Sequence, residues 1–178
     1  MIKTKEDLRK TAKEQLSRHS ASLKTKSEEI SRKLNSIISK SLDSSRSAIK
    51  IFTFLPLKRE VDIKKLNKWL IDNPKIEMYL PEKVKNAWKI TRESSSELKS
   101  NEIFENLREA NFMSDDIAII PGLLFSTKGD RLGRGGGTYD RYLKSCTCIK
   151  IGICFDFQLI NTIPTESHDE KVDFVIIG

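Results

Sequence analysis

The stretch IAIIPGLLFSTKGDRLGRGGGTYD, residues 117–140, determines the fold that we expect. It opens with four apolar residues, Ile117–Ile120, a pattern typical of a short strand buried on both faces of a parallel sheet. A glycine-rich run follows, and a helix should begin near Tyr139. Because ligands collect at the carboxyl ends of strands in such sheets, this stretch predicts both an α/β fold and the place of a binding site.

The glycine-rich run is too concentrated to be an effect of composition. Five of the eight glycines lie between Gly129 and Gly137, and none precedes residue 122. Glycine lets backbone N–H groups turn toward an anion, and Arg131 and Arg134 add planar guanidinium groups that match phosphate oxygens. The run lacks the Gly-Lys-Ser/Thr ending of a P-loop and the tight turn of the dinucleotide fingerprint. It therefore predicts a nucleotide-binding loop of another lineage, with a flexible surface turn as the alternative.

Strands and helices alternate on both sides of this stretch. Strand patterns cover residues 49–55, 76–80 (ended by Pro81), 87–91, 117–120, 149–155 and 172–177. Helical patterns cover two segments within residues 1–48, capped by Thr4 with Asp7 and by Thr25 with Glu28. Further helical patterns follow Asp62, which can cap a helix, cover residues 103–110, and begin near Tyr139. Residues Ser94–Ser96 should form a loop. The alternation predicts an α/β fold: one three-layer domain, residues 1–178, with a mostly parallel sheet between helices and residues 1–48 as a helical arm packed on the α/β core.

Composition narrows the class of protein. The 178 residues carry a net charge of +7, and residues 1–48 hold 12 Lys and Arg against 6 Asp and Glu. A basic arm suits nucleic acid or an anionic small molecule, and charge alone does not decide between them. No apolar run approaches the ~20 residues of a membrane span, so we expect a cytoplasmic protein. Three cysteines without a supporting His or Cys pair suggest reduced thiols and no zinc site.

Residues 121–143 resemble the signature of the 5-formyltetrahydrofolate cyclo-ligase (methenyltetrahydrofolate synthetase) family. Other segments agree with the family in order and spacing: Lys5–Arg9, Phe54-Leu-Pro56, Glu60–Asp62, and Pro164 with His168–Asp173. Thr138 stands where the family usually has an aromatic residue, and Ser126 where an aspartate is common. Residues 82–112 do not show the family's Gly-Ile-x-Glu/Gln-Pro stretch, which helps to close its folate pocket.

The resemblance implies an ATP-dependent reaction. In the family, the formyl oxygen of 5-formyltetrahydrofolate attacks the γ-phosphate of ATP, N10 attacks the phosphorylated imidate, and phosphate leaves. The products are 5,10-methenyltetrahydrofolate, ADP and phosphate. Such a reaction needs positioning and charge neutralisation more than a protein nucleophile.

The resemblance also implies roles for named residues. Arg134 and Tyr139 are expected at the reacting centre, and Glu60 and Tyr139 at the substrate. Asp140 and Asp173 are expected to hold Mg²⁺. The ATP-binding set is expected to be Lys5, Arg9, Arg131, Gly133, Arg134, Gly135, Gly136, Gly137 and Thr138.

Two other functions stay open. The unmatched 82–112 region leaves room for another ATP-using ligase on the same scaffold, with a different formyl or carboxyl substrate. The basic helices and the Arg-Gly loop leave room for a nucleic-acid-binding module, although no known RNA or DNA motif is present. We expect small-molecule substrates (a reduced folate and ATP with Mg²⁺), no nucleic-acid or membrane partner, and a monomer.

Overall fold

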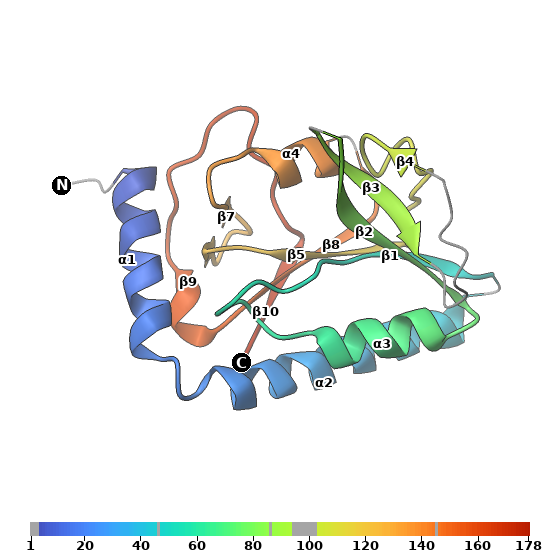
Figure 1. Ribbon diagram of the computed structural model, residues 1–178, viewed down its shortest axis with the longest axis horizontal. Coiled ribbons are helices and arrows are strands. Elements are labelled where there is room, and N and C mark those ends of the chain that lie inside the picture. Colours follow the sequence, from blue (N-terminus) through green and yellow to red (C-terminus); the bar gives the residue numbers. More distant parts are fainter. Residues whose placement is uncertain (1–3, 46, 86, 94–102, 145) are drawn as a thin grey trace.

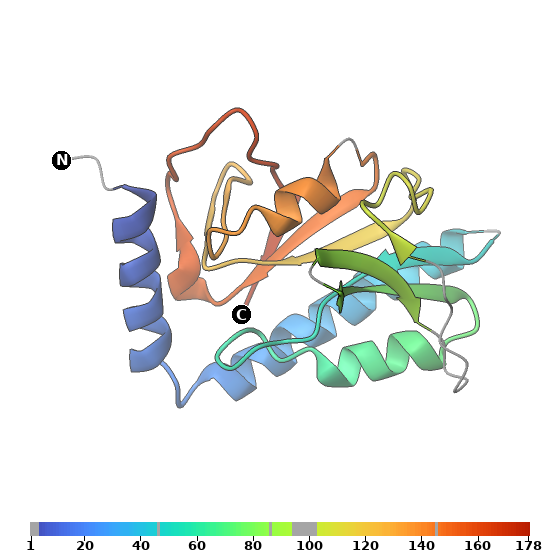
Figure 2. The same ribbon diagram turned by 45° about the horizontal axis from the view of Figure 1, so that its top comes forward.

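The computed structural model describes residues 4–45, 47–85, 87–93, 103–144 and 146–178. Figure 1 shows a sheet with α2 (Leu23–Ser44) and α3 (Lys64–Asp72) below it, α4 (Thr138–Leu143) above it, and α1 (Lys5–Arg18) standing at one end. The turned view in Figure 2 keeps α1 apart from the other helices. The predicted α/β class, with a mostly parallel sheet between helices, is confirmed.

Among the described residues, the main sheet has seven strands. Their order is β10 (Phe174–Ile177), β8 (Ile149–Cys154), β5 (Ile117–Pro121), β1 (Ile49–Phe52), β2 (Ile76–Val84), β3 (Ala87–Glu93) and β4 (Ile103–Phe104). The strands from β10 to β2 pair in parallel, whereas β3 is antiparallel to both β2 and β4. The carboxyl ends of β1, β5 and β8 therefore meet at one edge of the sheet.

Alternate residues of the central strands pack into two cores, one on each face. Ile51 packs with the apolar stripes of α1, α2 and α3, while Phe52 packs on the opposite face with α4. The two directions follow from the period of two along a strand. Ile119 and Ile120 repeat the pattern on β5, which is why this strand is apolar throughout.

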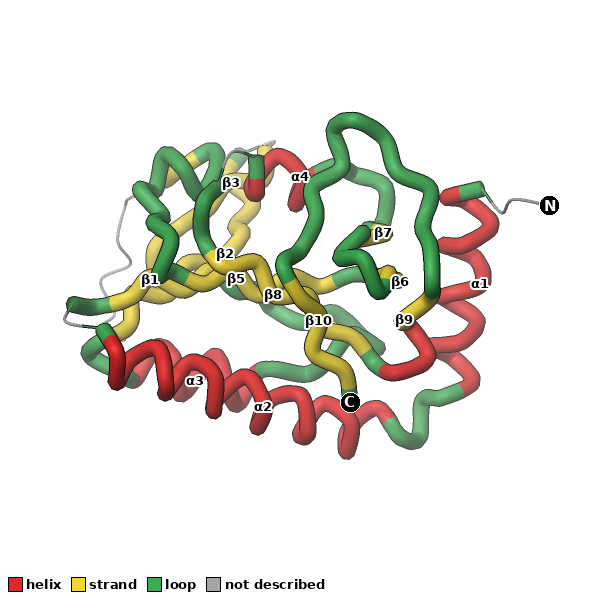
Figure 3. Tube along the Cα trace, turned by 180° about the vertical axis from the view of Figure 1, so that it is seen from behind, coloured by secondary structure: helices red, strands yellow, loops and turns green. Residues whose placement is uncertain are grey.

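A second, smaller sheet forms where the chain passes from β5 into the glycine-rich run. It has the order β7 (Arg131–Leu132), β6 (Leu124–Ser126) and β9 (Leu159–Ile160), and β9 follows the short 3₁₀ helix η1 (Asp156–Gln158). Seen from behind in Figure 3, α1 lies beside this sheet. The glycine-rich run thus begins inside a sheet and is held against α1.

Several details of the expected secondary structure are wrong. The second helix begins at Leu23 with Ser22 as N-cap, because Leu23 packs against the core and extends the helix beyond Thr25. Strand β2 continues through Pro81 to Val84. The missing N–H of Pro81 costs no ladder bond on the β1 side, since β1 pairs with β2 only as far as Tyr79.

Residues 103–110 form β4 and turns, not the expected helix. Ile103 and Phe104 pair with β3, and the N–H of Leu107 donates to the carbonyl of Tyr142. Tertiary partners therefore satisfy the backbone groups that a helix would have used. The loop expected at Ser94–Ser96 lies outside the described residues.

Two expected strands are shorter than their patterns, since β1 ends at Phe52 and β10 begins at Phe174, and the N-cap of α3 is Ile63 rather than Asp62. Thr4 and Asp7 form a capping box on α1, and Asp62 accepts a hydrogen bond from the N–H of Lys64 at the start of α3. The structure joins Cys146 and Cys148 in a disulfide, where the sequence suggested reduced thiols. No helix in the described ranges has the length and apolar character that crossing a bilayer requires.

Candidate active site

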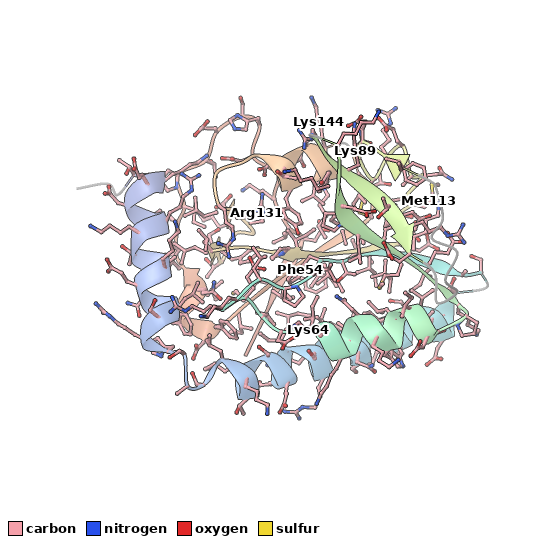
Figure 4. The ribbon with its side chains drawn as sticks, viewed as in Figure 1. Phe54, Lys64, Lys89, Met113, Arg131 and Lys144 are labelled. Atoms are coloured by element: carbon pink, nitrogen blue, oxygen red, sulfur yellow. A yellow bond between two sulfur atoms is a disulfide. The ribbon has the colours of Figure 1, made fainter. Side chains whose placement is uncertain are left out.

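A cavity of about 940 Å³ opens at the carboxyl edge of the main sheet. Its walls come from α1, the loop after β1, the start of the loop after β5, the glycine-rich run with α4, and the segment before β10. Figure 4 labels two of the lining residues: Arg131 lies between α1 and α4, and Phe54 lies near the centre, below α4. Every predicted site residue except Asp173 lines this cavity.

The glycine-rich run forms the exposed wall of the cavity. Gly135 and Gly137 have φ angles of 104° and 61°, in a region that favours glycine. Gly137 is the N-cap of α4, and its carbonyl accepts from the N–H of Arg141. The glycines therefore turn the chain sharply into the helix and keep side chains away from the cavity.

Arg131 lies beneath this wall and is almost fully buried. Its side chain is 4% exposed, and Nη2 donates to Oδ1 of Asp140 at 2.9 Å. The guanidinium carbon also lies 5.4 Å from the centre of the Tyr139 ring. Nε is buried without a hydrogen-bond partner among the described residues, so this arginine can still donate to a ligand.

Arg134 occupies the opposite environment. Its side chain is 48% exposed, and Nε and Nη2 both donate to Oε1 of Glu60, at 3.2 and 2.9 Å. Glu60 is only 15% exposed, and its Oε2 accepts from the N–H of Leu57. An ion pair thus joins the loop after β1 to the glycine-rich run across the cavity.

Lys5 and Arg9 lie one turn apart on α1 and both face the cavity. Nε of Arg9 donates to the carbonyl of Gly133 at 3.1 Å, which ties the helix to the loop. Nζ of Lys5 contacts Asp169 at 2.6 Å and Glu166 at 2.9 Å. Burial lowers the pKa of Lys5, but the two carboxylates outweigh it and the net shift is upward.

Tyr139 projects from the first turn of α4 into the cavity. Burial raises the pKa of its phenol far above the usual range, and the charge of Glu60 adds to this rise while Arg131 opposes it. The phenol therefore stays protonated at neutral pH, and acts as a hydrogen-bond donor and a flat apolar face rather than as a base.

The two predicted metal ligands lie in different places. Asp140 lines the cavity, and its Oδ1 accepts from Arg131 and from the N–H of Glu170. The carboxylate of Asp173 instead accepts from the N–H of Lys150, near the amino end of β8. The described residues contain no group of three His, Cys, Asp or Glu side chains suited to a metal ion. Asp169 is the other aspartate on the cavity wall.

Several lining residues were not predicted from the sequence. Glu166, His168 and Asp169 come from the segment before β10, and Phe54, Leu55 and Leu57 from the loop after β1. Leu55 and Leu57 are 63% and 57% exposed, so they give this wall of the cavity an apolar surface. That exposure appears only in the structure, because Leu55 belongs to the expected 49–55 strand and Leu57 to no motif.

Comparisons with known proteins agree with this geometry. The family model of the 5-formyltetrahydrofolate cyclo-ligase family matches residues 1–178. The mouse 5-formyltetrahydrofolate cyclo-ligase is 42% identical over 67 residues, and the Haemophilus influenzae enzyme of that name is 36% identical over 66 residues. Each of these matches spans about a third of this chain and a third of the relative (34% and 33% for mouse, 35% and 35% for H. influenzae).

Solved structures resemble the chain over nearly its whole length. The 5,10-methenyltetrahydrofolate synthetase of Aquifex aeolicus gives a TM-score of 0.72 at 24% identity, covering 97% of this chain and 89% of that one. The synthetase of Mycoplasma pneumoniae gives 0.73 at 24% identity, covering 97% of both chains. At this identity the likeness establishes the fold. The family model, which matches the chain from end to end, establishes that the chain belongs to the 5-formyltetrahydrofolate cyclo-ligase family.

Proposed function

We propose that the chain catalyses the ATP-dependent cyclisation of 5-formyltetrahydrofolate to 5,10-methenyltetrahydrofolate. The observation that carries the proposal is the single cavity lined by the predicted nucleotide residues and the predicted folate residues together. A cavity of about 940 Å³ lies at the upper end of the range for ligand pockets, as two bound substrates require. Family membership supports the reaction class.

The reaction balances without a covalent bond to the protein. The formyl oxygen attacks the γ-phosphorus, and the bond to ADP breaks. N10 then attacks the carbon that bears the phosphorylated oxygen, the C–O bond breaks as phosphate leaves with the former formyl oxygen, and N10 gives up its proton. The protein's task is to align the two substrates and to neutralise charge.

The glycine-rich run is proposed to bind the phosphates. Gly133, Gly135, Gly136 and Gly137 leave the backbone open to a phosphate oxygen, and Thr138 adds a hydroxyl beside them. Arg134 supplies an exposed guanidinium from the same loop. In the proposed binding mode, Lys5 and Arg9 contribute positive charge from α1, and the unpartnered Nε of Arg131 lies below.

The opposite wall is proposed to bind the folate. The carboxylate of Glu60 can accept from the N–H groups of a pterin ring, and the neutral phenol of Tyr139 can donate to the formyl region. Leu55 and Leu57 offer apolar surface for the rest of the substrate. Glu60 on this wall forms an ion pair with Arg134 of the glycine-rich run, so both substrates would approach the same point.

Magnesium fits this site as a companion of ATP. Because the described residues hold no cluster of three metal-binding side chains, the protein alone offers too few ligands. Mg²⁺ commonly keeps one or two carboxylates and takes its other ligands from phosphates and water. Asp140 and Asp169, the aspartates on the cavity wall, would hold the ion in place of the predicted Asp140 and Asp173 pair. The bound ion would neutralise part of the phosphate charge.

A direct test follows methenyl absorbance with protein, Mg-ATP and 5-formyltetrahydrofolate. We expect turnover, and a fall in kcat/KM of about 10²-fold for Arg134→Ala because one donor to the transferring phosphoryl group is lost. Lys144→Ala, at an exposed position outside the cavity lining, is the control and should keep its activity. Absence of product at every protein concentration would refute the proposal. Nucleotide binding without reduced-folate binding would favour the other ATP-using ligase.

The basic arm is proposed to serve anionic small molecules rather than nucleic acid. Two of its cations, Lys5 and Arg9, already line the cavity. The predicted single domain, monomeric state and cytoplasmic location accompany this proposal. Sedimentation should give a single species of about 20.4 kDa, and RNA binding should be no stronger than that of any basic protein at the same salt concentration.

A further inference from the structure

The Glu60–Arg134 ion pair joins two side chains that the proposed function assigns to different substrates. Oε1 of Glu60 accepts both contacts from Arg134, and its Oε2 is held by the N–H of Leu57. The oxygen of Glu60 that faces across the cavity, Oε1, is thus already occupied by Arg134. A pterin that donates to Glu60 and a phosphate that accepts from Arg134 must each compete with this pair.

We propose that the Glu60–Arg134 pair acts as a latch: the binding of either substrate breaks the ion pair and so frees the residue that binds the other substrate. This inference rests on the proposed function and adds to it a coupling between the two halves of the site. ATP that takes Arg134 leaves the Glu60 carboxylate free for the folate. Folate that takes Glu60 leaves the Arg134 guanidinium free for phosphate. Coupling of this kind is reciprocal in binding free energy.

The surroundings of the two side chains differ in how firmly they hold each one. Glu60 belongs to a fixed segment, since Leu57 holds its carboxylate and Arg59 donates to Oγ of Ser17 on α1. Arg134 instead follows Gly133 and precedes three exposed glycines. A Cβ built on Gly137 would meet no atom within 4 Å, so the loop has space around it. Arg134 therefore has room to turn away from the pair, whereas the Glu60 carboxylate is held by its second hydrogen bond.

The solvent exposure of Arg134 limits the strength of the ion pair. Arg134 is about half exposed, and ion pairs of that exposure are worth little each. Breaking one should change the affinity of a ligand by roughly 2- to 5-fold. This range is large enough to measure by calorimetry and small enough for either substrate to open the pair.

The experiment titrates a non-hydrolysable Mg-ATP analogue into the full chain without folate. Glu60→Gln keeps an acceptor for the N–H of Leu57 but removes the charge that holds Arg134. We expect this variant to bind the analogue roughly 2- to 5-fold more tightly than wild type. The matched control is Glu6→Gln, since Glu6 also lines the cavity, is exposed, and has no ion pair within the described part of the chain. An equal gain for both variants would show general electrostatics and overturn the latch.

Arg134→Gln supplies the second arm. Without nucleotide, this variant should bind 5-formyltetrahydrofolate more tightly than wild type, because Glu60 is no longer occupied. In the Glu60→Gln/Arg134→Gln double variant, the gain in nucleotide affinity from Glu60→Gln should vanish. A merely structural pair would make each single variant weaken both ligands, and that result would also overturn the latch.

The outcomes separate the latch from the proposed function. If wild type forms the methenyl product but neither single variant binds the other ligand more tightly, the latch is wrong and the function stands. If wild type binds neither ligand, both inferences are wrong. Each single variant carries its own test, so misfolding of one of them leaves the other to decide.

Discussion

Arg131 and Arg134 lie three residues apart in one loop, yet they occupy opposite environments. Arg131 is buried against Asp140 and the Tyr139 ring, whereas Arg134 is half exposed and faces Glu60. Both arginines look alike in the sequence, where each stands among glycines. Sequence could therefore predict that this loop carries positive charge, but not which arginine supports the fold and which remains free to move.

Replacing these two arginines should separate stability from binding. Arg131→Gln leaves Asp140 without its buried partner and should lower the free energy of unfolding by about 3 kcal/mol. Arg134→Gln breaks a half-exposed pair and should cost about 1 kcal/mol or less. Urea denaturation of both variants measures the difference. Equal losses would contradict the assigned environments.

The Lys5–Asp169 pair carries a pH-dependent part of the stability. Burial raises the pKa of Asp169, but the hydrogen bonds from Lys5 and from the N–H of Glu166 outweigh it, so the net shift is below the ordinary value of 3.8. The pKa of Lys5 is raised above 10.5. Because the pKa of Asp169 is lowered in the folded state, its contribution to stability is present above pH 3.8 and is lost as pH falls through the folded pKa. Because the pKa of Lys5 is raised, its contribution is present below pH 10.5 and is lost as pH rises through the folded pKa.

Lys5→Met should therefore lower stability by about 1 kcal/mol across neutral pH, with the difference shrinking below about pH 4. The measurement is the urea midpoint at several pH values. Lys10→Met, at an exposed position of the same helix, should show no such profile. A difference that stays constant into acid would mean that the ion pair contributes nothing.

Among the elements, the glycine-rich run combines glycines that the packing requires with glycines that it does not require. A Cβ on Gly129 would lie 2.3 Å from the carbonyl oxygen of Val172, and its φ is 81°. A Cβ on Gly136 would meet only the Thr138 hydroxyl, at an ordinary 3.5 Å. Gly129 therefore maintains the packing of the loop, whereas the packing does not require a glycine at position 136, where we propose that phosphate approaches the backbone.

Gly136→Ala should leave thermal stability unchanged or slightly raised, because its backbone conformation suits alanine and the unfolded chain loses entropy. The same change should weaken Mg-ATP binding, since a methyl group occupies the approach to the backbone. Gly129→Ala should do the reverse and destabilise the protein strongly. Thermal melts and calorimetric titrations of both variants test this contrast. Unchanged nucleotide affinity in Gly136→Ala would remove this glycine from the phosphate site.

Among the helices and strands, sequence patterns were sufficient to predict some elements and not others. Long apolar patterns predicted the strands around Ile51 and Ile119 and the stripe of α2, because burial enforces their periodicity. The strands of the small sheet have only two or three residues each, too few to show a period. The amphipathic pattern of 103–110 was misleading, since pairing with β3 and contacts with α4 override helix propensity there.

Across the whole molecule, the topology brings distant segments to one edge of the sheet. Lys5 near one end of the chain contacts Asp169 near the other, and Glu60 contacts Arg134. The family resemblance predicted most of these site residues by position. It named Asp173, whereas Asp169 is the aspartate of that segment that lines the cavity; the sequence offers both, and only the fold distinguishes their positions.

The reaction itself is tested most directly by following the formyl oxygen. Turnover of 5-formyltetrahydrofolate labelled with ¹⁸O in the formyl group, with unlabelled Mg-ATP, should release phosphate that carries one ¹⁸O for each methenyl product formed. That result follows if the formyl oxygen attacks the γ-phosphoryl group. Unlabelled phosphate accompanying methenyl formation would contradict the phosphorylated intermediate, and an absence of methenyl product would contradict the proposed function altogether.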